Sequence, residues 1–300
     1  MNPLNNVIVS TLQLFPKGFV KRFAMRYIAG EYIEDANKVV RELNSRKMMA
    51  TIDVLGENVS TREEASASSD AAIEVLKMID ENKLNANLSI KLTQFGLNID
   101  KDYCFENVKR IMDTAKGLGI FVRIDMEDSS VTTATLDTYE RFRKAGFDNT
   151  GIVIQAYLRR SEEDVKRLID MKASVRLCKG IYIEPESIAF KGKDEIRKNY
   201  VKLMGMLMEG GSRIGIATHD DLLVRAAYDL LSRDHLQPDG YEFQMLYGVR
   251  QDIRDRIVAD GHKLRVYVPF GKQWYAYSIR RFKENPQVAG YVFKSVMTGR

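Results

Sequence analysis

Near the end of the printed sequence, four polar side chains are spaced so that they can share one ligand. Tyr277, Arg280, Arg281 and Glu284 recur at helical intervals, which places them on one face of a helix. Two adjacent guanidiniums and a phenol suit the carboxylate of an amino acid or another organic acid. The same spacing also fits a solvated face on which Arg280 and Glu284 form an i,i+4 ion pair.

The composition is that of one large α/β domain, with 300 residues, 45% hydrophobic and 29% charged. No apolar run approaches the roughly 18 residues of a transmembrane helix, and no signal peptide opens the chain, so we expect a cytoplasmic protein. Cys104 and Cys178 lack metal-ligand spacing and are expected to be reduced thiols. The three histidines are scattered, so a zinc site is not expected.

The net charge of +5 is mild and no dense basic tract carries it, which excludes nucleic acid as the expected partner and favours acidic ligands. Part of the excess lies in residues 1–26, where Lys17, Lys21, Arg22 and Arg26 alternate with apolar residues. This segment fits amphipathic helices that pack on the main domain, or a peripheral contact with the inner face of an anionic membrane. We assign residues 1–45 to an N-terminal helical segment and 46–300 to the main domain.

From residue 48, short apolar runs alternate with longer amphipathic stretches, as in repeated βα units with a parallel sheet. The expected strands are 48–55, 87–92, 120–126, 151–157, 174–180, 213–219, 241–248 and 264–271. Helix starts are marked by Ser60 and Thr61 before REEA and by Ser161 before EEDV. Eight such units predict a (β/α)8 TIM-type barrel.

Polar residues gather at the carboxyl ends of these strands, where a barrel carries its site. They are Asp53, Glu57, Lys91, Gln94, Asp125, Glu127, Gln155, Arg176, Lys179, Thr218, His219, Gln244 and Tyr267. So many polar groups on one rim predict a site for a cofactor and a substrate.

The residues alone leave more than one chemistry open. Lys91 or Lys179 could form a Schiff base in a barrel lyase or aldolase. The turns after the last two strands, YGVRQD and FGKQ, lack the glycines of a barrel phosphate site. No GxGxxG follows the first strand, which argues against a Rossmann domain but not against a flavin inside a barrel.

A series of motifs, one at each strand, resembles the flavin-dependent proline dehydrogenase family. They are DVLGE, SIKLTQFG, RIDMED, VIQAYLRR, VRLCKGIY, ATHD, FQMLYG, RVYVPFG and YxxRRxxEN, in this order over residues 48–286. The resemblance implies a distorted (β/α)8 barrel that binds FAD, oxidises L-proline to Δ1-pyrroline-5-carboxylate and passes electrons to a membrane quinone. It also implies a monofunctional enzyme whose product goes to a separate pyrroline-5-carboxylate dehydrogenase.

For the substrate, the resemblance implies a carboxylate clamp made by Arg280 and Arg281, with Lys91 as a third positive charge. Glu284 would hold the arginine pair. The pocket would further contain Tyr267, Tyr277, Tyr182 and Asp125, the last placed near Lys91.

For the cofactor, the resemblance implies that Arg176 lies near the flavin nitrogen that accepts hydride, where a positive charge stabilises the reduced ring. Gln155 would hydrogen-bond the ring system. The remaining parts of FAD would be held by Lys179, Gly180, Thr218, His219 and Gln244.

Three positions bear on specificity. Ile181 stands where the family carries a smaller residue, and Asp220 where it generally has Asn, which puts a negative charge near the expected adenosine site. Tyr267, smaller in relatives that prefer hydroxyproline, favours L-proline as the substrate and leaves 4-hydroxyproline as the alternative.

Overall fold

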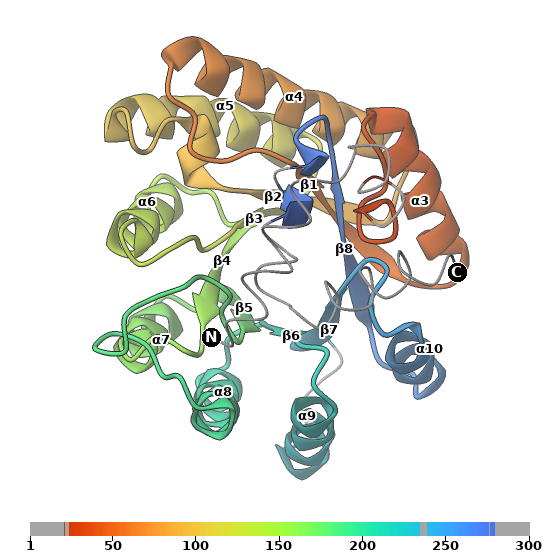
Figure 1. The fold of residues 1–300 in the computed structure, drawn as a ribbon, viewed down its shortest axis with the longest axis vertical. Helices are drawn as coiled ribbons and strands as arrows, with labels where there is room; N and C mark the ends of the chain where they lie inside the picture. The colour runs from red at the N-terminus through yellow and green to blue at the C-terminus, as the bar shows by residue number, and fades with distance from the viewer. Residues whose placement is uncertain (1–20, 22–23, 235–238, 276, 280–300) are drawn as a thin grey trace, which may run out of the picture.

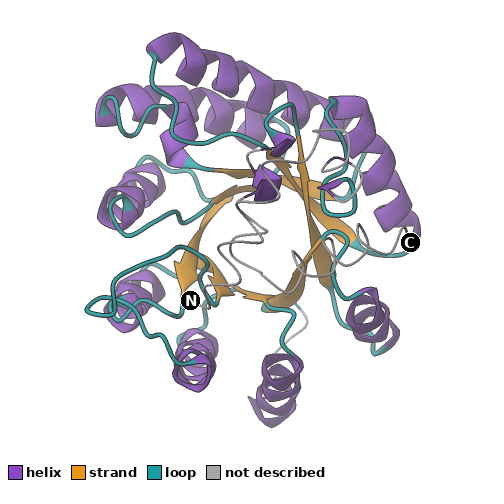
Figure 2. Cartoon of the chain, in the orientation of Figure 1, coloured by secondary structure: helices purple, strands orange, loops and turns teal. Residues whose placement is uncertain are grey.

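The computed structural model describes residues 21, 24–234, 239–275 and 277–279. Eight parallel strands close into a barrel with helices around it (Figures 1 and 2). The strands are β1 Met49–Val54, β2 Ala86–Ile90, β3 Val122–Ile124, β4 Thr150–Gln155, β5 Ser174–Cys178, β6 Ile214–Ala217, β7 Tyr241–Leu246 and β8 Leu264–Phe270. The predicted (β/α)8 barrel and all eight of its strands are confirmed.

The helices of the described part alternate with these strands. They are α3 Ile33–Ser45, α4 Arg62–Glu81, α5 Lys101–Gly117, α6 Thr132–Lys144, α7 Ser161–Asp170, α8 Lys193–Glu209, α9 Asp221–Asp234 and α10 Gln251–Ala259, with a 3-10 turn η1 at Leu92–Phe95. None of them combines the length and the apolar character that crossing a bilayer requires.

One of the two predicted helix caps is confirmed. Thr61 caps α4: its side chain accepts from the Glu64 amide, and the Glu64 carboxylate accepts from the Thr61 amide, each at 3.2 Å. The prediction for Ser161 is wrong, because α7 begins at Ser161 itself and Arg160 takes the cap position. The Ser161 hydroxyl instead donates to the Gln155 carbonyl at 2.6 Å, which ties the start of α7 to the end of β4.

The core lies between the strands and the helices. Alternate strand residues such as Ile52, Ile90 and Val266 are fully buried on the outer face of the sheet. The intervening residues point into the barrel, since Arg176 of β5 reaches Ser89 of β2 and Thr51 of β1 across it. The interior is therefore unusually polar for a packed barrel, and that polar interior supports the site.

Helix α3 covers the seam between β1 and β8, where a helix following β8 would lie in a regular barrel (Figure 1). The chain before α3 is tied to the end of β8: Ala29 donates to the Pro269 carbonyl at 2.9 Å, and Gly271 donates to Gly30 at 3.0 Å. After β8 the chain turns at Gly271, whose φ of +135° favours glycine, and is helical from Trp274. The division of the chain at residue 45 remains a prediction.

Candidate active site

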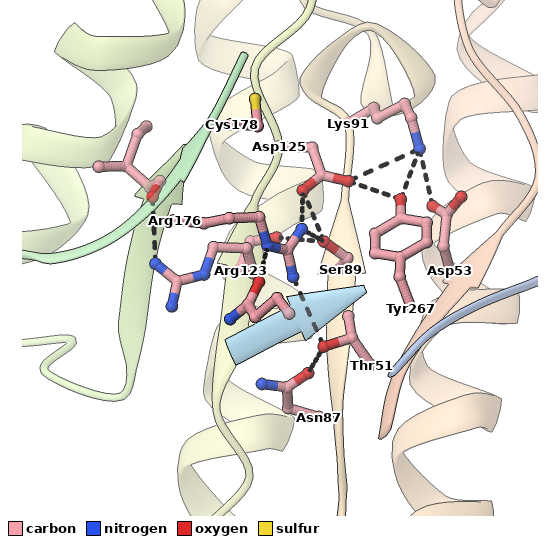
Figure 3. A network of polar contacts seen from close by, with 12 residues as sticks. Thr51, Asp53, Asn87, Ser89, Lys91, Arg123, Asp125, Arg176, Cys178 and Tyr267 are labelled. Carbon is pink, nitrogen blue, oxygen red and sulfur yellow. Dashed lines mark hydrogen bonds and ion pairs between the residues drawn. The ribbon is translucent and has the colours of Figure 1, made fainter. Parts of the chain in front are cut away.

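Five ionisable side chains meet inside the barrel near the carboxyl ends of its strands (Figure 3). They are Asp53 from β1, Lys91 after β2, Asp125 after β3, Arg176 from β5 and Tyr267 from β8. Lys91 Nζ lies 2.8 Å from Asp53 Oδ1, 3.3 Å from the Tyr267 hydroxyl and 3.8 Å from Asp125 Oδ2. The strand ends thus bring together residues that are far apart in the sequence, as predicted for this rim.

Asp125 is the centre of this cluster. Its carboxylate accepts hydrogen bonds from Tyr267, Arg176 and Ser89, each at 2.7 Å. Arg176 in turn donates through Nε to Gln244 of β7. Every side chain in the cluster is therefore held by at least one partner from another strand, which fixes its position.

The electrostatics of the cluster keep Lys91 charged. Burial lowers the pKa of Lys91, but the carboxylates of Asp53 and Asp125 outweigh it and raise the pKa above its ordinary value. Burial raises the pKa of Asp125, but Arg176 and Lys91 outweigh it and lower the pKa. A lysine held as a cation is a poor nucleophile, so this geometry argues against a Schiff base at Lys91.

Tyr182 and Gly180 lie on the loop that follows β5. Tyr182 is close enough to Lys91 to raise the pKa of the lysine. Gly180 has a φ of +105°, and a Cβ there would come within 2.0 Å of the Tyr157 ring. Only glycine fits this turn, which sets the course of the loop past the cluster.

A second polar group lies on the rims of β4 to β7. Gln155 donates to the Glu127 carbonyl at 2.8 Å, and His219 Nε2 accepts from the Leu246 amide at 2.8 Å. Thr218 Oγ1 accepts from the Asp220 amide at 3.2 Å. The first two bonds join neighbouring strand ends, and the third holds the turn that follows β6.

Asp220 is compensated by two cations. Its Oδ2 lies 3.1 Å from Lys179 Nζ and 2.9 Å from Arg197 Nε. Burial raises the pKa of Asp220, but its bonds to Arg197 and Lys179 outweigh it and lower the pKa. The negative charge at position 220 is thus offset by these two cations.

The arginines of the predicted carboxylate clamp lie outside the described residues. Tyr277 is buried on the helical stretch after β8. Arg280, Arg281 and Glu284 lie outside the described residues. Their roles stay predictions.

Some residues that shape the site were not predicted from the sequence. Ser89 bonds Asp125, while Thr51 accepts a long 3.5 Å contact from Arg176 and donates to Asn87 at 2.5 Å. The alternation of side chains along β2 could have predicted Asn87 and Ser89, because it turns them to the same side as Lys91.

A contact between two loops was not predicted from the sequence either. Ser129, after β3, donates through its amide at 2.7 Å and its hydroxyl at 2.6 Å to Glu184, on the loop after β5. These two loops are separated by 55 residues. No local sequence pattern indicates such a contact.

The donor set fits a flavin nucleotide. Arg176 is a buried cation that donates to Gln244, and Lys179 and Arg197, both paired with Asp220, are more exposed cations at the rim, of the kind that holds phosphates.

Comparison with known proteins gives a consistent result. Residues 36–293 match a family model described as proline dehydrogenase. The chain is 36% identical over 288 residues to proline dehydrogenase 1 of Bacillus subtilis (strain 168), covering 96% of this chain and 95% of that protein. It is 32% identical over 280 residues to the proline dehydrogenase of Deinococcus radiodurans, covering 92% and 90%.

Solved structures resemble this one in the barrel. The crystal structure of proline utilization A (PutA) from Bdellovibrio bacteriovorus inactivated by N-propargylglycine superposes with a TM-score of 0.82 at 28% identity. The match covers 88% of this chain and 33% of that chain, so the present chain spans about a third of that structure.

Proposed function

Because this chain belongs to the proline dehydrogenase family, we propose that it oxidises L-proline to Δ1-pyrroline-5-carboxylate with FAD, and that a membrane quinone takes the electrons. This is the first step of proline catabolism to glutamate. The observation that carries the proposal is the buried cluster of Lys91, Asp125, Arg176 and Tyr267 at the carboxyl rim of the barrel. A charged, rigid cluster at that rim is where a barrel enzyme keeps its chemistry.

The chain's own part in the reaction is to bind and orient the substrate. Arg280 and Arg281 grip the proline carboxylate, and Lys91, kept cationic by Asp53, adds a third positive charge. Tyr267, anchored to Asp125, confines the five-membered ring together with Tyr277 and Tyr182. Fixed orientation supplies much of the rate, since no strong nucleophile is needed.

The cofactor residues divide by chemistry. Arg176, Gln155 and Gln244 would hold the flavin ring, and Lys179, Gly180, Thr218 and His219 would hold the ribityl, phosphate and adenosine parts. FAD, when bound, would supply the acceptor for the hydride that leaves the substrate carbon. The positive charge of Arg176, oriented by Asp125 and Gln244, favours negative charge on the ring.

The location and partners follow from the proposed reaction. A quinone acceptor lies in a membrane, so we propose a cytoplasmic protein that meets the inner membrane face peripherally through residues 1–26, and a separate dehydrogenase that consumes the product. Liposome flotation of the whole chain and of a chain without residues 1–26 tests the contact. Equal flotation of the two forms contradicts it.

The first test of the function is the visible spectrum of the purified protein under anaerobic conditions, before and after L-proline. A flavin spectrum that bleaches with L-proline, but not with lysine or glutamate, is the expected result. Bleaching only by 4-hydroxyproline would move the assignment to that substrate. A colourless protein that borohydride traps with its substrate would make it a Schiff-base lyase at Lys179 or Lys91.

A further inference from the structure

A cavity of about 440 Å³ lies at the opposite end of the barrel, around the amino ends of the strands. Among its lining residues are Arg123 of β3, Arg213 just before β6, Glu242 of β7 and Arg265 of β8. None of these residues has a part in the proposed oxidation. The cavity is thus separate from the Lys91 cluster, which occupies the carboxyl end.

The charges around this cavity do not balance. Its ionisable lining residues are Lys83, Arg123, Arg213 and Arg265 against Asp80 and Glu242. Lys83 pairs with Asp80 at 2.9 Å. Arg265 pairs with Glu242 through two bonds, of 2.6 Å and 3.1 Å. Arg213 is left 3.9 Å from Glu242, at the edge of an ion pair, and about half of its side chain is exposed.

Arg123 contributes the buried part of the excess positive charge around the cavity. It is 4% exposed, and its terminal nitrogens donate to the carbonyls of Ile152 and Ser174 and to the Ser174 hydroxyl. Among the described residues its Nε has no acceptor, and no carboxylate forms an ion pair with it. Burial, together with repulsion from Arg176, lowers the pKa of Arg123 to about 9.

The strands make room for this guanidinium. A Cβ at Gly151 of β4 would come within 2.3 Å of Arg123 Nη1, so glycine is needed beside it. Asn87 of β2 also lines the cavity. Its Oδ1 accepts a hydrogen bond from the Thr51 hydroxyl at 2.5 Å, so its amide nitrogen points away from Thr51 and is a further hydrogen-bond donor. Arg123 is thus a buried cation that forms no ion pair with a carboxylate, and an anion beside it would lower the cost of burying its charge.

We propose that this cavity binds a small oxyanion of the phosphate class, held by Arg213 at the rim and Arg123 in the wall. Guanidinium forks match phosphate oxygens in pairs, and phosphate carries between one and two negative charges near neutral pH, as the unbalanced lining requires. The volume admits inorganic phosphate or a small phosphate ester. Binding at this end leaves the proline site open.

The test uses the protein with its cofactor bound and measures thermal unfolding while inorganic phosphate replaces chloride at constant ionic strength. The wild-type midpoint should rise by a few degrees and saturate, since a ligand that binds only the folded state stabilises it. Arg213→Gln, at an exposed position that the fold tolerates, should need roughly tenfold more phosphate for the same rise. The matched control is Arg225→Gln, an exposed arginine of α9 outside the cavity.

Three results would overturn the proposal. They are a wild-type midpoint that does not respond to phosphate, an identical response in Arg213→Gln, and an equal loss of response in Arg225→Gln. Equal stabilisation by succinate at the same ionic strength would overturn the phosphate assignment. Saturating L-proline should leave the phosphate response unchanged, and competition between the two would place the anion at the other end of the barrel.

Discussion

At the scale of single residues, the cluster around Lys91 pairs each buried charge with an opposite charge from another strand. Asp53 has no exposed surface, and Lys91 is the cation that bonds it. Burial, reinforced by Asp125, raises the pKa of Asp53 even though Lys91 opposes the shift. Each charge in the cluster therefore depends on a partner from another strand, and single replacements should be felt both in stability and in activity.

Lys91→Met should lower the free energy of unfolding by about 3 kcal/mol at pH 8, because it leaves the buried Asp53 carboxylate without its bonded cation. The loss should shrink at pH 5, where protonation relieves that charge. Urea denaturation at both pH values measures it. The double variant Asp53→Asn, Lys91→Met is the control and should recover at least part of the loss, whereas additive losses would contradict the pairing.

Arg280→Lys and Arg281→Lys should each raise the KM for L-proline by about tenfold or more, because lysine offers a point charge in place of a planar fork. Steady-state kinetics with an artificial acceptor checks this. Lys272→Arg, at an exposed position just after β8, is the control and should leave KM unchanged. An unchanged KM in both clamp variants would rule out the carboxylate clamp.

Asp220 should contribute acid sensitivity. Its pKa is lower in the folded protein than the ordinary value of 3.8, so the stability from its carboxylate is present above that value and is lost as the pH falls through the folded pKa. Asp220→Asn should therefore show a shallower fall of the unfolding midpoint below about pH 4. Asp229→Asn, an exposed carboxylate of α9, the helix that begins directly after Asp220, is the control and should follow the wild type.

At the scale of elements, the sequence was most informative where the pattern repeats. Apolar runs predicted all eight strands, because the outer face of each strand must be buried under helices. Rim residues such as Lys91, Asp125 and Arg176 followed from their places at strand ends. The closure of eight parallel strands also followed from their number.

Other features could not be read from local patterns. Ser161 precedes acidic residues as a capping serine would, but α7 begins at Ser161 itself, and its hydroxyl donates to the Gln155 carbonyl without accepting from a helix amide. The contact of Ser129 with Glu184 depends on two loops meeting in space. The Arg123 cavity was not predicted either, because its residues come from the amino ends of strands, where the sequence reading expected no site.

Gly180→Ala should weaken cofactor retention and lower the unfolding midpoint by several degrees. Alanine is strained at a φ of +105°, and its Cβ would collide with Tyr157. The flavin-to-protein absorbance ratio after gel filtration and a thermal scan measure both effects. Gly205→Ala is the control, because a Cβ at that position in α8 meets nothing within 4 Å and helical alanine is favoured, so its midpoint should stay or rise.

At the scale of the whole molecule, one connected polar network runs along the barrel. Arg265 bonds Glu242, Gln244 bonds Glu242 at 2.7 Å, and Arg176 links Gln244 to Asp125. The network thus reaches from the cavity at the amino ends to the cluster at the carboxyl ends. Removal of a central member should disturb both ends.

A chain that begins after residue 45 should fail to fold. It lacks α3, which covers β1 and β8 and buries Val40 and Leu43 against them. The absence of a cooperative thermal transition is the expected result. The control is a chain without residues 1–20 that keeps residues 21–45 and hence α3, and it should keep a cooperative transition. A cooperative, wild-type transition without α3 would contradict the role of this helix.

The position of α3 also has a consequence for the time course of folding. The seam that this helix covers joins the first strand to the last, and the bond from Arg265 to the Ala50 carbonyl spans 215 residues. During synthesis α3 emerges early, yet half of the surface it must cover appears only when β8 has left the ribosome. The apolar face of α3 therefore stays uncovered until nearly the whole chain has been synthesised. We expect barrel closure to be the late and slow step of folding. Until it occurs, the chain is most exposed to aggregation and most dependent on chaperones.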